Sequence, residues 1–428
     1  MKTILLIISF GFLSQANAQL LTLDDAIKIA LKNNLDIEIE KNNFEINKIN
    51  NNIAVAGGMP NVSSAISSQQ SVVDVNQKLN TGLNINRAGS LSNSTNASIS
   101  ASQLLYNGSR VITTKKRLEA LQKQSEFQLN AQIQNTMALV MVKYYDVVRQ
   151  QFYLNTIQQS IELSRKQKEI IETKKSVGLA TDAEYFQSQI DLNSRMQDFQ
   201  SQQTIVSQVK VDLLNVLNLK LDTIIVIKDS ILIAEDIQLN QVLSSSNTNP
   251  EISSLDQQIK INNYLFKEME AMRKPSLNAG AGFNYGRTQN AAGQLLLNQY
   301  YGPYLGIGLT IPIYNGGAVK RQLQSADIRT KTTVLQKEVA ILNHQTAATK
   351  TYQSYISGIE QIKTQGYTFG LSSQLVALVM QKFKLASATI IEVREAQKSY
   401  EEAAFRLVNL EYLTKIAEIE LRRLSNQL

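Results

Sequence analysis

One stretch of this chain occurs twice, and its two copies lie 208 residues apart. Val177–Gln189 aligns with Leu385–Gln397 without a gap. The same offset carries the triplet Tyr106-Asn107-Gly108 onto Tyr314-Asn315-Gly316. Two matches at one offset indicate a duplicated unit, and a duplication constrains the architecture more strongly than any single element does. We therefore interpret the chain as two repeats of one design.

Each repeat ends in a long helical hairpin. We predict helices over 109–176 and 182–219 in the first repeat, and over 318–384 and 390–428 in the second. Only 5 Pro and 19 Gly occur in 428 residues, and such sparse punctuation favours long helices. The last helix carries an apolar seam at three- and four-residue spacing, which is typical of a coiled coil. Its members are Tyr400, Ala403, Leu407, Leu410, Thr414, Ala417, Leu421, Leu424 and Leu428. In the first repeat the equivalent seam is interrupted by Arg195 and Gln202.

A pair of strands is predicted before each hairpin. Apolar and small polar residues alternate from Leu277 to Tyr285 and again from Tyr304 to Ile313. The counterparts in the first half are 61–75 and 95–106, and the loops fall over 76–93 and 289–302. The apolar face would meet a second sheet in a soluble sandwich, or lipid in a membrane barrel.

The membrane interpretation carries a consequence for assembly. A membrane barrel needs about eight strands at least, so the four strands of one chain cannot close one. Open strand edges are not tolerated in lipid, because their backbone groups would lack hydrogen-bond partners. Several chains must then share one barrel. The predicted fold class is mainly α, with long coiled-coil hairpins and four strands for a shared barrel.

The N-terminus has the pattern of a secretory signal peptide. Lys2 precedes an apolar run from Ile4 to Leu13, and Ala16-Asn17-Ala18 forms a cleavage site. No later apolar run is long enough for a transmembrane helix. We divide the chain into a signal peptide (1–18), a first repeat (19–219), a connecting segment (220–249) and a second repeat (250–428). Each repeat opens with a helix, one over 23–55 and one from Asn249-Pro250, and the connecting segment holds a short strand near 223–227.

Composition excludes several classes of function. The absence of Cys rules out disulfides and thiolate-bound zinc or iron–sulfur sites. The formal net charge of +7 is spread along the chain, which argues against a nucleic-acid partner. The single His344 lies inside a helical stretch, and no phosphate-binding loop, nucleophile elbow or metal-ligand cluster occurs. We therefore expect no enzyme, no cofactor and no metal site.

Taken together, these features resemble the TolC-type outer-membrane efflux protein family. The resemblance covers essentially the whole mature chain and depends on the order and spacing of motifs that are individually weak. These motifs are Leu21-Thr22-Leu23-Asp24-Asp25-Ala26-Ile27, Leu104-Leu105-Tyr106-Asn107-Gly108, Ile311-Pro312-Ile313-Tyr314-Asn315-Gly316-Gly317 and the bend Val177-Gly178-Leu179-Ala180-Thr181.

The resemblance implies a homotrimer in the outer membrane of a Gram-negative bacterium, extending into the periplasm. Each chain would give four strands to a twelve-stranded barrel, and the helices would continue as a tunnel. Such channels are passive exit ducts of tripartite efflux or type I secretion systems. Their partners are an inner-membrane pump and a periplasmic adaptor, which supply energy and cargo.

The resemblance also assigns the two bends to the periplasmic tip, where relatives dock the adaptor. The first bend contributes Val177, Gly178, Leu179 and Thr181, and the second contributes Leu385, Ala386 and Thr389. Ala386 stands where relatives usually have Gly, which leaves the turn there open. A simpler interpretation is that Gly178 merely permits a turn with positive φ, and the two interpretations are compatible.

Acidic residues beside the bends match the closed end of the tunnel in relatives. Glu392 and Glu395 lie on one helix face, and a trimer would form two rings of carboxylates that favour cations. Phe383 and Glu184 are candidates for closing contacts. Alternatively the carboxylates are simply solvated, or Arg394 between them neutralises one.

A secreted coiled-coil surface or filament protein is the alternative. It accounts for the signal peptide and the seam but not for two strand pairs at matched positions. A requirement for detergent would separate the two hypotheses.

Overall fold

The computed structural model describes residues 19–428, and the predicted signal peptide lies outside the described residues. The described chain forms two compact units. The first, here the helical unit, holds the described residues up to Asn42 together with Phe127–Ser253 and Val339–Leu428. The second, here the strand unit, holds Asn43–Glu126 and Ser254–Glu338.

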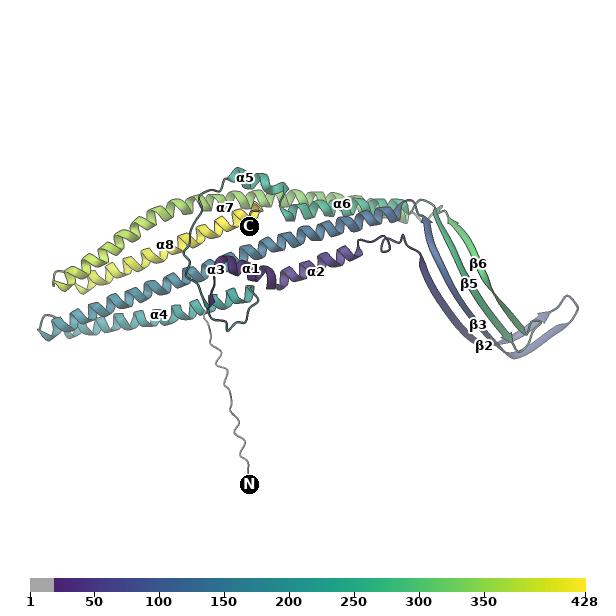
Figure 1. Cartoon of the computed structure of the whole chain (residues 1–428), viewed down its shortest axis with the longest axis horizontal. Coiled ribbons are helices and arrows are strands. Elements are labelled where there is room, and N and C mark those ends of the chain that lie inside the picture. The colour runs from purple at the N-terminus through teal and green to yellow at the C-terminus, as the bar shows by residue number, and fades with distance from the viewer. Residues whose placement is uncertain (1–18) are drawn as a thin grey trace, which may run out of the picture. The chain divides into compact units, whose positions relative to one another are not determined.

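The strand unit contains one antiparallel sheet in the order β2-β3-β5-β6, visible as four long arrows in Figure 1. The strands are β2 (Asn61–Lys78), β3 (Asn84–Tyr106), β5 (Ser276–Asn290) and β6 (Leu297–Thr310). The two strand pairs of the two repeats therefore join through β3 and β5 into one sheet. This confirms the prediction of mainly helical structure with four strands per chain.

The register confirms the predicted division between the two faces of the sheet. Ile99 lies opposite Phe283, and Ala281 lies opposite Leu305, so that apolar side chains share one face. Ser100 and Tyr304 both lie opposite Gly282 and belong to the other face. Because facing residues in adjacent strands project to the same side, one face is apolar and the other carries small or polar groups.

Both predicted loops are too long. β2 continues to Lys78 and β3 begins at Asn84, so most of 76–93 is strand. β5 and β6 likewise leave only 291–296 as the loop instead of 289–302. Polar residues occupy both faces near these turns, so the side chains show no alternation. The ladder nevertheless continues because it is formed by the backbone, as the pair Asn76–Asn86 shows.

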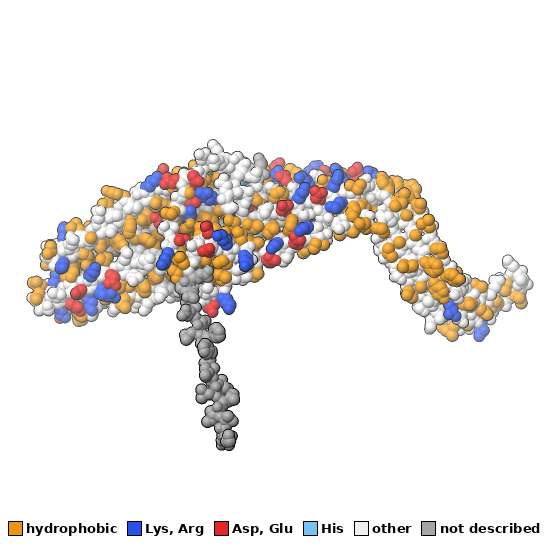
Figure 2. All heavy atoms as spheres, in the orientation of Figure 1, with side chains coloured by type: hydrophobic (Ala, Val, Ile, Leu, Met, Phe, Trp, Pro, Cys, Tyr) orange, Lys and Arg blue, Asp and Glu red, His pale blue; other side chains and the backbone are white. Residues whose placement is uncertain are grey.

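The apolar face and the outer strands of the sheet have no cover within the described residues. Leu305 is 83% exposed, Ile66 78% and Ile307 72%. Figure 2 shows hydrophobic side chains gathered over the strands. β2 and β6 each pair on one side only among the described strands. An apolar surface with open edges is a site for lipid or for further chains.

The repeated Tyr-Asn-Gly triplets turn the chain from strand to helix. Gly108 has φ +69° and Gly316 has φ +65°, both in the left-handed region that favours glycine. At Gly108 a Cβ would lie 2.7 Å from Cβ of Lys274, so this neighbouring segment of the same chain leaves no room for a side chain. The duplicated triplet is thus explained by backbone geometry.

The helical unit is built around two hairpins. α3 (Arg110–Ser176) is followed by α4 (Asp182–Val216), and α7 (Ala318–Lys384) by α8 (Ile390–Leu424). α3 and α7 begin in the strand unit and continue into the helical unit. The bounds of these four helices agree with the predicted ones to within four residues. Among residues 19–428, no helix is sufficiently long and apolar to span a bilayer.

The first predicted helix, 23–55, is wrong as a single element. α1 (Leu23–Asn33) ends before Asn34, and α2 (Leu35–Asn50) begins after it. Asn34 has ψ 128° and its side-chain oxygen accepts hydrogen bonds from the N–H groups of Asp36 and Ile37. An asparagine that caps the next helix in this way interrupts the first one. The opening helix of the second repeat, α6 (Pro250–Ala271), is continuous.

The predicted coiled-coil seam of α8 lies in the interior of the helical unit. Every seam residue is buried or half-buried, and Leu421 is fully buried. The polar interruptions on α4 have partners. The Arg195 guanidinium lies 2.8 Å from the carboxylate of Glu401 on α8, and the Gln202 amide donates to Gln150 on α3. The two polar residues that interrupt the seam therefore link α4 to its neighbouring helices by an ion pair and a hydrogen bond.

The connecting segment packs on the helical unit. The predicted short strand is β4 (Ile225–Val226), which pairs in parallel with β1 (Gln19–Leu20). Two short helical turns follow, α5 (Leu239–Ser244) and η1 (Ser245–Asn247). The carboxylate of Glu418 on α8 accepts a hydrogen bond from the Ala234 N–H, 3.1 Å away, and pairs with Lys415 and Arg422. This buried ion cluster anchors the segment to α8.

Candidate functional site

The two bends of the duplicated motif lie at the same end of the helical unit, at the far left in Figure 1. In the first, the Leu179 N–H donates to the Lys174 carbonyl at 2.7 Å. In the second, the Ser387 N–H donates to the Lys382 carbonyl at 2.8 Å. A hydrogen bond that spans five residues past a left-handed residue is the Schellman ending of a helix. The two bends are therefore the same structure.

The left-handed position of the bend is Gly178 in the first hairpin and Ala386 in the second. Their φ angles are +75° and +60°. Ala386 thus forms the same turn as the glycine, although a side chain in this region costs about 1 kcal/mol. No atom lies within 4 Å of a Cβ built on Gly178, so the glycine serves the backbone and not packing within the chain.

A capping box lies at the N-terminus of α4 and of α8, the second helix of each hairpin. The Thr181 hydroxyl accepts from the Glu184 N–H at 3.2 Å, and the Glu184 carboxylate accepts from the Thr181 N–H at 2.8 Å. Thr389 and Glu392 repeat the arrangement at 3.2 and 2.6 Å. Hydrogen bonds from Thr389, with a smaller contribution from Lys382, hold the pKa of the Glu392 carboxyl below its usual value. The sequence signal for this role is the spacing of Thr and Glu.

The candidate gate residues have different surroundings. Glu184 is half-buried and Glu392 is exposed, and both carboxylates turn back onto their own helix ends, whereas Glu395 is exposed and forms no ion pair among residues 19–428. Arg394 points elsewhere, because its Nε lies 3.9 Å from the Asp191 carboxylate on α4. The free carboxylate of this group is therefore that of Glu395.

Phe383 is 4% exposed and joins the two hairpins of one chain. It packs in a cluster with Ile171 of α3 and Val393 of α8. The Lys174 ammonium donates to the Phe383 carbonyl at 2.6 Å and lies 4.2 Å from the centre of its ring. These contacts hold the base of both bends together and leave their outer ends free.

The outer ends of the bends carry exposed apolar side chains. Leu385 is 76% exposed, Leu179 74% and Val177 65%. Figure 2 shows hydrophobic side chains at this end beside basic and acidic ones. Large apolar side chains grouped at the tip of a helical hairpin mark a surface for a partner.

The structure thus brings all the predicted docking residues to one end of the helical unit. Sequence reasoning missed the lysines Lys166, Lys174 and Lys384, which line a groove beside these bends. They come from helices about 210 residues apart in the sequence, and no local pattern marks them.

Residues 244–427 match the family model described as outer membrane efflux protein. No curated protein matches the chain in a sequence search. Among solved structures, the Campylobacter jejuni CmeC outer membrane channel is 16% identical with a TM-score of 0.77, covering 95% of this chain and 85% of that one. The Vibrio cholerae outer membrane protein VceC is 15% identical with a TM-score of 0.75, covering 94% and 96%.

CusC, whose structures concern folding and transmembrane channel formation, is 17% identical with a TM-score of 0.75 and covers 94% of this chain and 91% of that one. The family match over residues 244–427 and the shared fold confirm the predicted resemblance to outer-membrane efflux proteins. Members of this family are channels and not enzymes.

Proposed function

We propose that this chain is the outer-membrane exit duct of a tripartite efflux or type I secretion system and acts as a homotrimer. The single observation that carries the proposal is the sheet with one exposed apolar face and two open edges. Four strands per chain require partner chains to close a barrel, and three chains supply twelve strands. The small polar face would then line the lumen.

The long hairpins fit the periplasmic part of such a duct. Their bends offer Val177, Leu179 and Leu385 to a periplasmic adaptor that connects to an inner-membrane pump. A purely secreted coiled coil would have no use for an exposed apolar sheet. We propose no catalytic role, and the duct passes cargo that the pump delivers.

The proposed gate is a ring of three Glu395 carboxylates close to the bends, with Glu392 one turn earlier. Because Glu392 also caps its helix, replacing it with Ala would disturb the turn. Gln preserves the capping geometry and removes the charge. Lowered cation selectivity in Glu395→Gln and Glu392→Gln, each compared with wild type, is the expected result. Unaltered currents in both variants would refute the gate.

The proposed function is tested by planar-bilayer conductance of the protein extracted in detergent. We expect discrete steps that favour cations. Gly178→Trp should leave these steps intact while it abolishes pump-dependent export in cells, because a large side chain then occupies the docking surface. A protein that is soluble without detergent and never conducts would contradict the proposal.

A further inference from the structure

The apolar face of the sheet ends at a pair of tyrosines. Along β5 this face presents Leu277, Ala279, Ala281, Phe283 and Tyr285, and Tyr301 of β6 lies opposite Tyr285. Eight steps of about 3.4 Å separate Leu277 from Tyr285, which is about 21 Å of height at a strand tilt of about 40°. Outer-membrane barrels have an apolar band about 25 Å tall with aromatic residues at its borders. Tyr285 and Tyr301 therefore mark one border of the band.

The first charged side chain of this face lies one row beyond the tyrosines. Arg287 of β5 is opposite Thr95 of β3 on one side and Gln299 of β6 on the other. The next row holds Asn93, Gln289 and Leu297. One row is two residues, or about 5 Å of height on a tilted strand. An arginine here can lay its methylene groups on the band while its guanidinium reaches the headgroup region.

The guanidinium of Arg287 has no carboxylate partner among residues 19–428. The side chain is exposed, and its Nη2 donates a hydrogen bond of 3.4 Å to Oε1 of Gln289 in the same strand. Asp74 is the single carboxylate in the four strands, and it accepts a hydrogen bond from the Gly89 N–H at 2.7 Å. The sheet thus leaves this cation at the border of its apolar face without a counter-ion.

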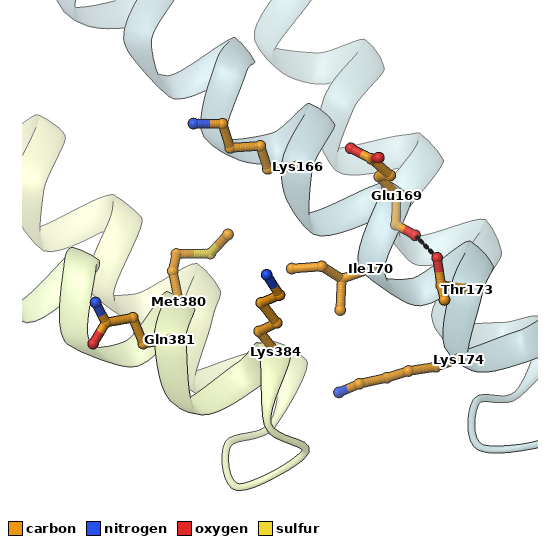
Figure 3. Close-up of a pocket in the computed structure, with 8 residues that line it drawn as sticks. All are labelled: Lys166, Glu169, Ile170, Thr173, Lys174, Met380, Gln381 and Lys384. Carbon is orange, nitrogen blue, oxygen red and sulfur yellow. Dashed lines mark hydrogen bonds between the residues drawn. The ribbon is translucent and has the colours of Figure 1, made fainter.

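The surroundings of Arg287 differ from those of the lysines near the bends. Lys166, Lys174 and Lys384 border a hollow between helices together with Glu169 (Figure 3). Arg287 instead borders an apolar surface, and Figure 2 shows basic side chains toward the turns of the sheet, beyond the hydrophobic ones. A cation beside an apolar band is favourable where anionic headgroups lie close to it. Its position therefore indicates an anionic partner at the membrane surface.

The end of the sheet that carries Arg287 is the outer one under the proposed function. α3 begins after Tyr106, which lies opposite Leu277 at the other border of the band. The periplasmic helices therefore leave the sheet there, and the turns at 79–83 and 291–296 face the outside. Arg287 then lies at the level of the headgroups of the outer leaflet.

We propose that Arg287 and the polar side chains around it bind the phosphorylated sugar headgroup of a glycolipid in the outer leaflet. The guanidinium pairs with a phosphate through two hydrogen bonds, the arrangement in which arginine binds phosphate most strongly. Thr95, Gln289 and Gln299 hydrogen-bond sugar hydroxyls. The acyl chains pack on the apolar band beside Tyr285. The proposal rests on the proposed function and adds a lipid partner to it.

The uncharged side chains favour a glycolipid over a phospholipid. A phosphate needs only the guanidinium of Arg287. Around it, hydroxyl and amide side chains that both donate and accept hydrogen bonds extend over two rows: Thr95, Asn93, Gln289 and Gln299. Sugar hydroxyls also donate and accept, and a sugar headgroup carries more of them than a glycerol phosphate does. The surface therefore fits a headgroup made of sugars and phosphate.

The dependence of lipid binding on phosphate tests the proposal without a mutation. Full-length protein is extracted in an uncharged detergent with EDTA, so that divalent cations cannot bridge other anions. Lipid A, dephosphorylated lipid A and phosphatidylglycerol are added in turn, and native mass spectrometry counts the lipids bound to each particle. We expect lipid A to bind once per chain and the other two lipids to bind at least tenfold more weakly. Equal binding of dephosphorylated lipid A or of phosphatidylglycerol would overturn the proposal.

Two neighbouring residues on opposite faces provide a variant and its matched control. Arg287→Gln should weaken lipid A binding at least tenfold, because the hydrogen bonds to a charged phosphate are lost. Thr288→Glu changes the net charge by the same amount, but Thr288 lies opposite Ser94 on the polar face. It should bind lipid A as the wild type does, and the same spectra show that both variants assemble. Equal weakening in both variants, or in neither, would contradict the proposal.

A single thiol locates the bound lipid. The chain has no Cys, so Gln299→Cys introduces a unique thiol in the row of Arg287, and Asn298→Cys introduces one on the opposite face. Lipid A should slow maleimide labelling of Gln299→Cys and leave that of Asn298→Cys unchanged. Unchanged labelling of both would place the lipid elsewhere and overturn the proposal. Channels that conduct in bilayers but bind no lipid A would refute this proposal alone, whereas chains that are soluble without detergent would refute the proposed function.

Discussion

The sheet exposes the apolar side chains of one face, whereas the helical hairpins bury many of theirs in a core. In the sheet, Leu305 and Ile307 are among the most exposed side chains, whereas Leu213 and Leu421 in the hairpins are fully buried. Conversely, the hairpins bury polar groups such as Gln167 and Glu401. The core of the hairpins is thus stabilised by its own chain, whereas the apolar face of the sheet depends on lipid and neighbouring copies. Stability and assembly can therefore be disturbed separately.

The largest effect is expected from a charge on the apolar face of the sheet. Leu305→Arg should prevent assembly in a membrane, because a cation near the bilayer midplane costs about 2–4 kcal/mol for each substituted side chain. The neighbouring Gly306→Arg points to the opposite face, where no atom lies within 4 Å of an added Cβ. It should assemble normally and reduce cation selectivity. Heat-resistant oligomers on gels and single-channel currents measure both outcomes. Equal behaviour of the two variants would contradict the assignment of faces.

A cavity in the hairpins should lower stability without preventing membrane insertion. Leu421→Ala removes a fully buried side chain of α8 and is expected to cost about 2–5 kcal/mol of unfolding free energy. Leu413→Ala on the same helix is the control, since Leu413 is 51% exposed. Denaturation in detergent followed by circular dichroism compares them. Similar losses in both variants would show that the seam is not the core of the unit.

The buried carboxyl of Glu401 should make the hairpins sensitive to pH. Burial raises its pKa above the usual value, despite the opposing influence of the Ser160 hydroxyl and the charge of Arg195. The folded chain therefore holds this proton to higher pH than the unfolded chain, and stability falls as pH rises from the unfolded pKa through the raised folded pKa. Glu401→Gln should remove that part of the decline. Arg195 retains Asp198, 3.4 Å away, as a partner. Thermal melting between about pH 4 and pH 8 measures the difference, and parallel curves would refute it.

The smallest effect concerns the two bends. Gly178→Ala should cost about 1 kcal/mol and Ala386→Gly should gain a similar amount, because only glycine adopts positive φ without strain. The exchange tests whether both bends have the same backbone. Melting temperatures of the two variants provide the measurement. A loss of stability in Ala386→Gly would mean that the alanine methyl group makes a contact of its own.

Much of this fold could be predicted from the sequence because its signals are local. The bounds of α7 follow from Gly316-Gly317 before it and the turn before Thr389 after it. The bends repeat at one offset, so one bend predicts the other. Regular alternation likewise marked the parts of β5 and β6 whose apolar side chains share one face of the sheet.

Other features could not be predicted, for two physical reasons. Where polar residues interrupt the apolar face of a strand, as Arg87 and Asn93 do in β3, pairing by the backbone continues without a clear side-chain pattern. Where a site is built by distant segments, as in the groove of Lys166 and Lys384, neither segment carries a signal by itself. The capping role of Glu392 could have been predicted from its spacing from Thr389, but the sequence analysis interpreted its charge as part of a gate.

The central claim is that the sheet of one chain is an incomplete part of a shared barrel. Native mass spectrometry of the detergent-extracted protein tests this most directly, because it counts the chains in each particle. The account predicts particles of three chains that resist dissociation and that disappear in Leu305→Arg but not in Gly306→Arg. Stable single chains, in detergent or in water, would contradict it, since one chain would then satisfy its own strand edges.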